Sequence, residues 1–343
     1  MGELEALVTL WPEMPHYKYF AHDSRVHGIR LNTAMADPKT LPGLLKLAVE
    51  TSDTPLYFDV KGRQLRVTSV VPRKDRLECY LNHPISVETP TPVLFKAGAD
   101  GALLERVEDV GYRLVFRGGP QYNVIPGESL HIRHPSLSVG GELFPWPQKE
   151  FLKMAKDAGI SRYMLSYVGS QAEVDEMREH VGDDLIVCKI EDRKGLDFVA
   201  KEYVKAPNLG LLTARGDLFV EVQRPHDILH ATRQIVQKDP DAILGSRILL
   251  SVTNETVPSC ADMGELGWLF DQGYRRLMFC DSLCLKREPL DRALNILNAV
   301  YESYVGGVRP EEIPVHVRPA LEPKDPLRFF SVKRAIDSLW GAE

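Results

Sequence analysis

The sequence predicts an α/β fold: a (β/α)8 TIM barrel with a small all-β lid domain inserted after the third strand. Short β-rich apolar runs alternate with amphipathic helical segments along most of the chain. Eight such runs can be traced, each apolar enough to be covered on both faces, which is typical of parallel β/α architecture. Residues 68–137 interrupt the alternation with β-rich pieces and turn signals but no convincing helix.

The predicted elements follow one another in barrel order. The strands are Ala6–Trp11, Gly28–Asn32, Leu56–Val60, Tyr163–Tyr167, Leu185–Ile190, Leu209–Ala214, Arg247–Val252 and Arg276–Cys280. Apolar residues three and four apart predict helices over Leu41–Glu50, Lys149–Ala158, Glu173–Val181, His226–Gln237 and Pro289–Tyr304. Gly159 and Gly182 stand where two of these helices should end.

The interruption sets the predicted domain boundaries. Residues 1–67 and 138–309 would form the barrel, residues 68–137 the inserted lid, and the proline-rich residues 310–343 a tail packed on the barrel. An insertion at this point grows from the carboxyl ends of the strands, where the active sites of such barrels lie. A lid over the site is therefore the favoured interpretation, and a decorative insertion stays open.

Composition argues against several classes of protein. The formal net charge is −6 and no basic run is present, so no nucleic-acid partner is expected. No apolar run approaches the ~20 residues that cross a bilayer, and the N-terminus is acidic where a signal peptide would be basic. The five scattered cysteines have no C-x-x-C spacing, as expected for reduced thiols. We expect a cytoplasmic chain without a membrane partner.

Polar residues at the ends of the fifth and sixth predicted strands indicate a metal site. Lys189 and Glu191 are two apart and should share one face of their strand, with Ile190 on the other. Asp217 follows the adjacent strand and would supply a second carboxylate. Two carboxylates completed by water and substrate oxygens suit Mg²⁺ or Mn²⁺. A structural ion pair beside an ordinary turn is the alternative.

Several motifs resemble those of pyruvate kinase, in the family's order and over roughly residues 6–305. The specific ones are Cys188-Lys189-Ile190-Glu191-Asp192 and Thr213-Ala214-Arg215-Gly216-Asp217-Leu218. The first three strands carry the weaker matches, which are Val8-Thr9-Leu10-Trp11-Pro12, Ile29-Arg30-Leu31-Asn32, Asp59-Val60-Lys61-Gly62 and Leu65-Arg66. Pro135-Ser136-Leu137 is similar to the point where that family's lid rejoins its barrel.

The resemblance implies roles for individual residues. Glu191 and Asp217 would bind the divalent metal, and Lys189 and Arg30 would be catalytic, acting on the phosphoryl group of phosphoenolpyruvate. The remaining implied roles are substrate binding by Ala214, Arg215, Gly216 and Thr253, nucleotide-phosphate binding by Arg66, and a monovalent-cation remnant at Asn32 and Asp59.

The sequence also departs from the family pattern. Ala34 and Val60 stand where two further monovalent-cation ligands would carry side-chain oxygens, so K⁺ should not be required. Arg63, four residues after Asp59, is expected to place its guanidinium where that cation would sit, with a solvent-facing position as the alternative. Cys280-Asp281-Ser282 replaces the family's Ser-Gly-Glu, and no counterpart of the family's C-terminal effector domain is expected.

These observations predict a metal-dependent pyruvate kinase-like phosphotransferase acting on phosphoenolpyruvate, pyruvate or a related 2-oxo acid. One alternative is a Mg²⁺-dependent carbon–carbon lyase or aldolase that works through a pyruvate enolate. Another is a non-catalytic ligand-binding relative. The expected partner is the small-molecule substrate, and a nucleotide and a homo-oligomer stay open.

Overall fold

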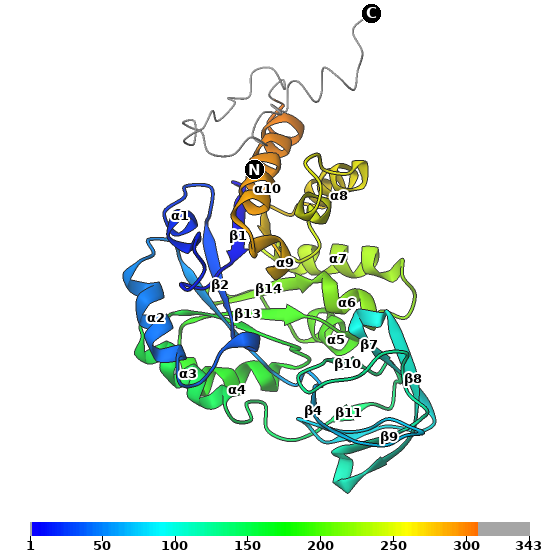
Figure 1. Cartoon of the computed structure of the whole chain (residues 1–343). Helices are drawn as coiled ribbons and strands as arrows, with labels where there is room; N and C mark the ends of the chain where they lie inside the picture. Colours follow the sequence, from blue (N-terminus) through cyan, green and yellow to red (C-terminus); the bar gives the residue numbers. More distant parts are fainter. Residues whose placement is uncertain (1, 308–343) are drawn as a thin grey trace, which may run out of the picture.

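The computed structural model describes residues 2–307 and contains the predicted barrel (Figure 1). Its parallel strands close in the order β1-β16-β15-β14-β13-β12-β3-β2. They span Glu5–Thr9 (β1), Gly28–Asn32 (β2), Leu56–Val60 (β3), Arg162–Leu165 (β12), Leu185–Ile190 (β13), Leu209–Ala214 (β14), Ile243–Gly245 (β15) and Arg276–Met278 (β16). The fold class is therefore confirmed.

Helices connect the strands and surround the barrel (Figure 1). They are α1 (Tyr17–Ala21), α2 (Leu41–Glu50), α3 (Gln148–Asp157), α4 (Gln171–Val181), α5 (Arg193–Lys201), α6 (Arg215–Glu221), α7 (Asp227–Lys238), α8 (Cys260–Asp271), α9 (Asp281–Cys284) and α10 (Arg287–Val300). Short 3₁₀ helices are η1 (Thr33–Met35), η2 (Lys96–Gly98), η3 (Asp109–Gly111) and η4 (Leu250–Thr253), and a π-helical turn, η5, covers Tyr301–Val305. None of the helices between residues 2 and 307 is both long and apolar enough to span a bilayer.

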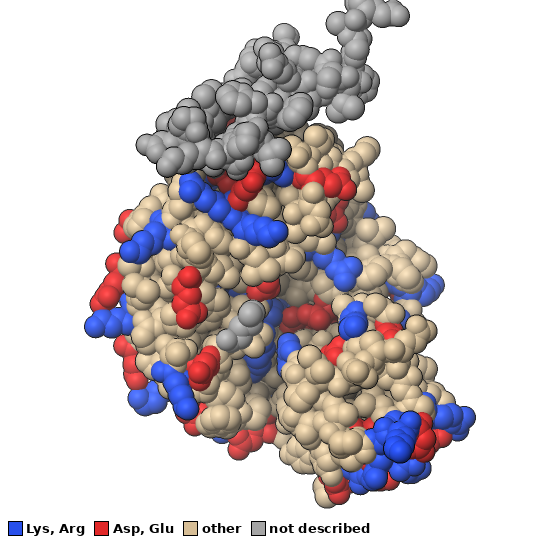
Figure 2. Space-filling model, viewed as in Figure 1, with Lys and Arg blue, Asp and Glu red and all other residues tan. Residues whose placement is uncertain are grey.

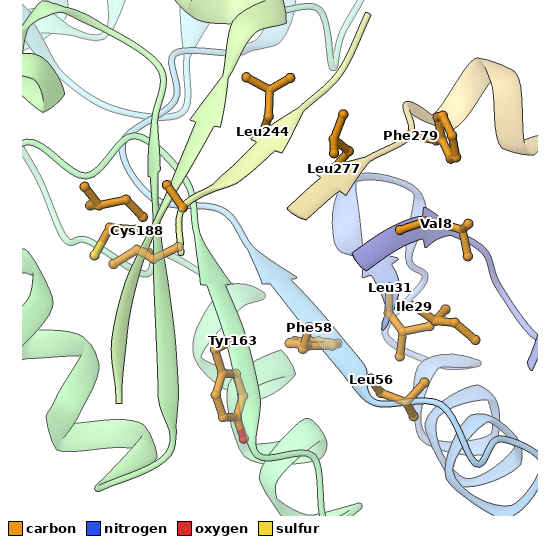
Figure 3. Packing of buried hydrophobic residues seen from close by; sticks show 14 of the residues in the cluster. Val8, Ile29, Leu31, Leu56, Phe58, Tyr163, Cys188, Leu244, Leu277 and Phe279 are labelled. Carbon is orange, nitrogen blue, oxygen red and sulfur yellow. The ribbon is translucent and has the colours of Figure 1, made fainter. Parts of the chain in front are cut away.

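Alternation along the strands separates an outer core from an inner one, because successive side chains point to opposite faces. Outward residues such as Ile29, Phe58 and Cys188 pack in the large cluster beneath the helices (Figure 3). Inward residues form a smaller cluster that fills the barrel. It includes Tyr57, Met164, Val187, Leu212, Ile243 and Met278.

The next inward positions toward the carboxyl ends of β2, β3 and β13 are charged. Arg30, Asp59 and Lys189 occupy them and are 7%, 0% and 5% exposed. Since the layer below is apolar, these groups lie at the boundary between the packed interior and the barrel mouth. The strand periodicity thus positions a charged layer where this fold carries its chemistry.

A separate antiparallel sheet lies between β3 and α3, and we call it the lid. Its strand order is β10-β7-β8-β9-β5-β4. The strands are β4 (Val67–Val71), β5 (Glu78–Leu81), β7 (Thr91–Phe95), β8 (Asp100–Glu108), β9 (Arg113–Arg117) and β10 (Leu130–His131); β6 (Ile85–Ser86) pairs with β11 (Ser138–Val139) beside it. The lid has its own core around Phe95 and Phe116. Acidic and basic side chains gather in the hollow between it and the barrel (Figure 2).

Four strand predictions were wrong in position. The first strand is Glu5–Thr9 rather than Ala6–Trp11, and the fourth is Arg162–Leu165 rather than Tyr163–Tyr167. The seventh strand is Ile243–Gly245 rather than Arg247–Val252, and its three residues are too short to give a clear apolar signal. The chain then turns through Ser246, whose φ is +63°, and enters η4, so Val252 is buried without pairing in the barrel. The eighth strand ends at Met278 because Cys280 precedes α9. The predicted tail, residues 310–343, lies outside the described residues.

Candidate active site at the barrel mouth

Asp59 lies at the centre of the charged layer. Its Oδ2 accepts a 2.7 Å hydrogen bond from Arg30 Nε and a further one from Nη2 of the same guanidinium, and Lys189 Nζ lies 3.2 Å away. Ser166 donates its hydroxyl to Oδ1 over 3.2 Å. Burial would raise the pKa of Asp59, but Lys189, Lys61 and Arg30 hold that pKa well below its usual range. The carboxylate is therefore ionised and fully paired.

Lys189 connects this ion pair with the predicted metal site. Its Nζ lies 2.9 Å from Ser166 Oγ and 3.2 Å from Glu191 Oε1, in addition to its contact with Asp59. Burial opposes its charge, yet Asp59 and Glu191 raise its pKa above the ordinary value. The ammonium is thus a fixed positive charge held between two carboxylates.

Glu191 and Asp217 differ in environment. Glu191 is 3% exposed, and its Oε2 accepts a 2.7 Å hydrogen bond from the Tyr167 amide. Burial raises the pKa of Glu191 to about 7; Asp217 and Asp59 add to the rise, and Lys189 opposes it. Asp217 is in the first turn of α6 with its side chain 33% exposed. Because Asp217 raises the pKa of Glu191, the two carboxylates repel each other.

This donor set fits a hard divalent cation. A cation between two repelling carboxylates would relieve their repulsion, and oxygen ligands are what Mg²⁺ and Mn²⁺ prefer. Within residues 2–307 no group of three or more His, Cys, Asp or Glu side chains is placed so that it could hold a metal ion. An ion bound by Glu191 and Asp217 would therefore need further ligands in addition to these two carboxylates.

Arg30 also contacts the opposite side of the mouth. Its Nη1 lies 3.1 Å from Asp281 Oδ2 and 3.3 Å from Thr9 Oγ1. Asn32 Nδ2 donates to the second oxygen of Asp281 over 2.8 Å. Burial opposes ionisation of Asp281, but Arg30 and Asn32 lower its pKa. Arg30, the predicted phosphoryl-binding residue, thus already contacts one carboxylate that is half exposed.

Lys61 brings a third cation to the mouth. Its Nζ donates to Asn32 Oδ1 over 3.2 Å. Burial, with repulsion from Lys189 and Arg30, lowers the pKa of Lys61 to about 8 although Asp59 opposes this. A positive charge therefore sits beside Asn32 and Asp59, the two residues of the predicted cation remnant.

Arg63 does not occupy that position, and the expectation for it was wrong. Its Nη1 pairs with Glu173 Oε1 at 2.5 Å, and its Nη2 donates to the Gly141 carbonyl over 3.1 Å. The chain turns away from the mouth at Gly62, where an added Cβ would lie 2.3 Å from the Ser166 carbonyl oxygen. The guanidinium therefore joins the barrel rim to α4, and Arg30, Lys61 and Lys189 compensate Asp59 instead.

The segment after β14 holds the predicted substrate-binding residues. The Gly216 amide donates to Ser246 Oγ over 2.9 Å. Arg215 binds Glu265 Oε1 at 2.6 Å and the Ser246 carbonyl at 3.0 Å. Ala214 ends the strand and is 7% exposed in the inner core. The Gly216 amide faces the end of β15, and the Ser246 hydroxyl already accepts its hydrogen bond.

Two predicted residues lie away from the Lys189 cluster. Thr253 belongs to η4, which packs on α9 and α10, and its Oγ1 is buried with no partner among the described residues. Arg66 lies at the base of the lid, donating to Gln64 Oε1 over 2.7 Å and to the Gly127 carbonyl over 2.6 Å. No contact joins either residue to Lys189, although the charge of Arg66 influences Lys61.

Four members of the site were not predicted from the sequence, namely Ser166, Lys61, Ser246 and Asp281. Ser166 and Ser246 directly follow β12 and β15, so the rule that polar residues after barrel strands form the site would identify both. It failed because those two strands were placed too far along the chain. Asp281 was noted only as a departure from a motif, although it also follows the last strand.

The chain is similar to pyruvate kinases over much of its length. It is 24% identical to pyruvate kinase of Thermoplasma acidophilum over 294 residues, 78% of this chain and 52% of that protein. It is 24% identical to the Dictyostelium discoideum enzyme over 241 residues, 62% of this chain and 47% of the relative. It is 25% identical to the Encephalitozoon cuniculi enzyme over 159 residues, which are 45% of this chain and 35% of that relative.

This chain spans about half the length of the first two of these relatives. No protein-family model matches it. The resemblance found in the motifs is confirmed: the chain is a pyruvate kinase-like relative at low identity.

Proposed function

We propose that this pyruvate kinase-like chain is a divalent-metal-dependent enzyme acting on phosphoenolpyruvate, pyruvate or a related 2-oxo acid by phosphoryl transfer. One observation carries the proposal: Lys189 is held between Asp59 and Glu191, while the Asp217 carboxylate beside them stays open. A fixed ammonium next to two metal-binding carboxylates suits a site that receives a metal ion and a phosphoryl group together.

Each residue of the mouth has a role in this proposal. Lys189 would stabilise the negative charge on the transferring group, and Ser166 and Asp59 fix the position of its ammonium. Arg30 would hold phosphoryl oxygens by exchanging its exposed partner, Asp281, for the substrate. Glu191 and Asp217 would hold Mg²⁺ or Mn²⁺. When bound, the ion would polarise the substrate's oxygens and neutralise charge in the transition state.

The same site would orient the rest of the substrate. A substrate carboxylate would compete with Ser246 for the Gly216 amide, between Ala214 and Arg215. Thr253 would take part only if η4 approaches the mouth with substrate present. Arg66, at the base of the lid, would meet the phosphates of a nucleotide acceptor. A cytoplasmic setting and a homo-oligomer are also part of the proposal.

Activity without K⁺ also belongs to the proposal. Ala34 and Val60 offer no side-chain oxygen, and Lys61 Nζ lies 3.2 Å from Asn32 Oδ1, so an ammonium already stands beside the cation remnant. Rates measured in K⁺ and in tetramethylammonium chloride should agree within about twofold. Strong activation by K⁺ would contradict this part.

A second candidate is carbon–carbon cleavage or enolisation of an unphosphorylated 2-oxo acid. It is favoured by the pairing of Arg30 with Asp281, which occupies the guanidinium face that a phosphoryl group would need. The carboxylates and Lys189 would then stabilise an enolate. The two candidates differ in whether phosphate leaves the substrate.

The test is phosphoryl transfer from phosphoenolpyruvate to a panel of nucleoside diphosphates with Mg²⁺ or Mn²⁺, beside deuterium exchange at C3 of 2-oxo acids. Lys189→Met should lower kcat about 10²–10³-fold with little change in KM, because its charge acts mainly on the transferring group. Lys201→Met, which removes an exposed lysine on α5, is the matched control. Deuterium exchange without phosphoryl transfer would favour the second candidate. If both activities are absent, the alternative of a non-catalytic ligand-binding relative is favoured.

A further inference from the structure

We propose that the lid supplies a metal ligand: His131 Nε2 and Asp217 Oδ1 flank a site for a first-row divalent cation. His131 belongs to β10 of the lid and is 1% exposed, whereas Asp217 belongs to α6 of the barrel. The two atoms lie 4.0 Å apart. The inference rests on the proposed function in one respect, which is that Asp217 binds the divalent ion.

The lid rests on α6 at this point. The turn η2 packs against α6, and an added Cβ at Gly98 would lie 3.5 Å from Val220 Cγ1. Figure 1 shows this part of the lid beside α6. His131 pairs with a residue of the same helix, since its Nδ1 lies 2.6 Å from Glu221 Oε1. The imidazole is therefore held from the barrel side although it comes from the lid.

The pairing with Glu221 selects the tautomer. A carboxylate only accepts hydrogen bonds when ionised, so Nδ1 must carry the proton and donate it to Glu221. In the neutral imidazole this leaves a lone pair on Nε2. Histidines that bind metals usually donate their other N–H to a carboxylate in this way, which fixes the ring and raises its basicity. The Glu221–His131 pair is thus prepared for coordination.

The second ring nitrogen of His131, Nε2, makes no hydrogen bond within the described part of the chain. His131 Nε2 is buried and without a hydrogen-bond partner there, which is costly for a polar atom. It faces the open carboxylate of Asp217. In the neutral imidazole no hydrogen bond can form between the two groups, because the lone pair and the carboxylate are both acceptors. A cation between them would satisfy both.

The spacing is close to what a metal needs. Two bonds of about 2.1 Å separate their donor atoms by roughly 3.4 Å at a tetrahedral angle and by roughly 3.0 Å at an octahedral one, so Nε2 and Oδ1 must approach by about 0.5–1 Å. A side-chain rotation of Asp217, which is only partly buried, provides this. Because one ligand is an imidazole, the site should favour Mn²⁺, Co²⁺ or Zn²⁺ over Mg²⁺. Binding would also hold the lid against α6.

Electron spin echo spectroscopy of Mn²⁺ bound to the full chain tests this. A directly bound imidazole should give ¹⁴N modulation that changes when the protein is grown with ¹⁵N-histidine. His131→Gln should remove the nitrogen signal and weaken Mn²⁺ at least about tenfold, since losing even the carboxylate behind a ligating histidine costs roughly 10–100-fold. His134→Ala, at a partly buried lid histidine bonded to Ser136, is the matched control and should change neither quantity.

Wild-type protein alone decides the main question, so a folding defect in a variant cannot obscure it. Bound Mn²⁺ without nitrogen modulation would overturn the inference, and the proposed function would survive if Asp217→Asn still abolished Mn²⁺ binding. Failure of the wild-type chain to bind Mn²⁺ at all would overturn both. Persistence of the nitrogen signal in His131→Gln would assign it to another residue and reject His131.

Discussion

The two sides of the barrel mouth differ in how completely their charges are paired. On the side of β2 and β3, Arg30, Asp59 and Lys189 satisfy one another, and every oxygen of Asp59 has a partner. On the side of α6, Glu191 is pushed toward its neutral form, and Asp217 faces an imidazole nitrogen that has no hydrogen-bond partner among the described residues. The first side is fully paired within the protein, whereas the second has the unpaired groups to which we propose that a ligand binds.

The largest expected effect concerns the paired side. Asp59→Ala leaves buried cations uncompensated and should lower the free energy of unfolding by about 3–5 kcal/mol. Asp217→Ala is the control on the other side. It removes a repulsive neighbour of Glu191 and should cost less than about 0.5 kcal/mol, or stabilise the metal-free protein. Urea unfolding followed by circular dichroism measures both, and equal losses would mean that the two sides do not differ.

The next effect is the pH dependence that Glu191 causes. Its pKa is raised from 4.5 to about 7, so its stabilising contribution is present below pH 4.5 and is lost as the pH rises through about 7. At 1.36 kcal/mol per unit, metal-free protein should lose about 3 kcal/mol relative to Glu191→Gln between pH 4.5 and 8. Thermal or urea unfolding of both proteins across this range gives the difference.

Mn²⁺ should oppose that loss in the unmodified protein, because it binds the ionised carboxylate. At low pH the Glu191 side chain of the unmodified protein is neutral, like the glutamine of the isosteric Glu191→Gln variant, so the two proteins are compared there first. A stability difference that does not change with pH would show that Glu191 ionises normally.

The smallest effect lies outside both sides of the mouth. Arg63 and Glu173 form a partly exposed pair whose side chains are 24% and 12% exposed. Arg63→Met should cost about 1 kcal/mol or less and should create no dependence of activity on K⁺. Guanidinium unfolding and rates with and without K⁺ measure these outcomes. A new requirement for K⁺ in Arg63→Met would contradict this and would indicate that the Arg63 guanidinium acts at the barrel mouth.

Sequence reasoning located the strands that carry long β-rich runs. The bounds of β2, β3, β13 and β14 were predicted to the residue, and period-two alternation placed Lys189 and Glu191 side by side. It failed at β15, where only three residues form the strand. The apolar signal of the following residues comes from their packing beneath helices, and sequence alone does not distinguish that from strand pairing.

The site was harder to predict where it depends on distant contacts. Arg30 and Asp59 lie on neighbouring strands, so topology alone brings them together. His131 meets Asp217 and Glu221 only because the lid docks on α6, a contact across 86 and 90 positions of sequence. The prediction for Arg63 failed because residues close in sequence are not always close in space. Arg63 is four residues from Asp59, but the backbone turns at Gly62.

That turn also has a mechanical meaning. An added Cβ at Gly62 would lie 2.3 Å from the Ser166 carbonyl oxygen, so the backbone at Gly62 packs against this carbonyl more closely than any side chain allows. Beyond it, Arg66 binds the Gly127 carbonyl and its backbone bridges to Ser129, so the outgoing and returning segments are fastened together. If the lid moves as a body, the outgoing segment at Arg66 and the returning segment at Ser129 therefore move together, about a hinge after Gly62. Lys61 then keeps its place in the mouth, while His131, two residues after Ser129, moves with the stems.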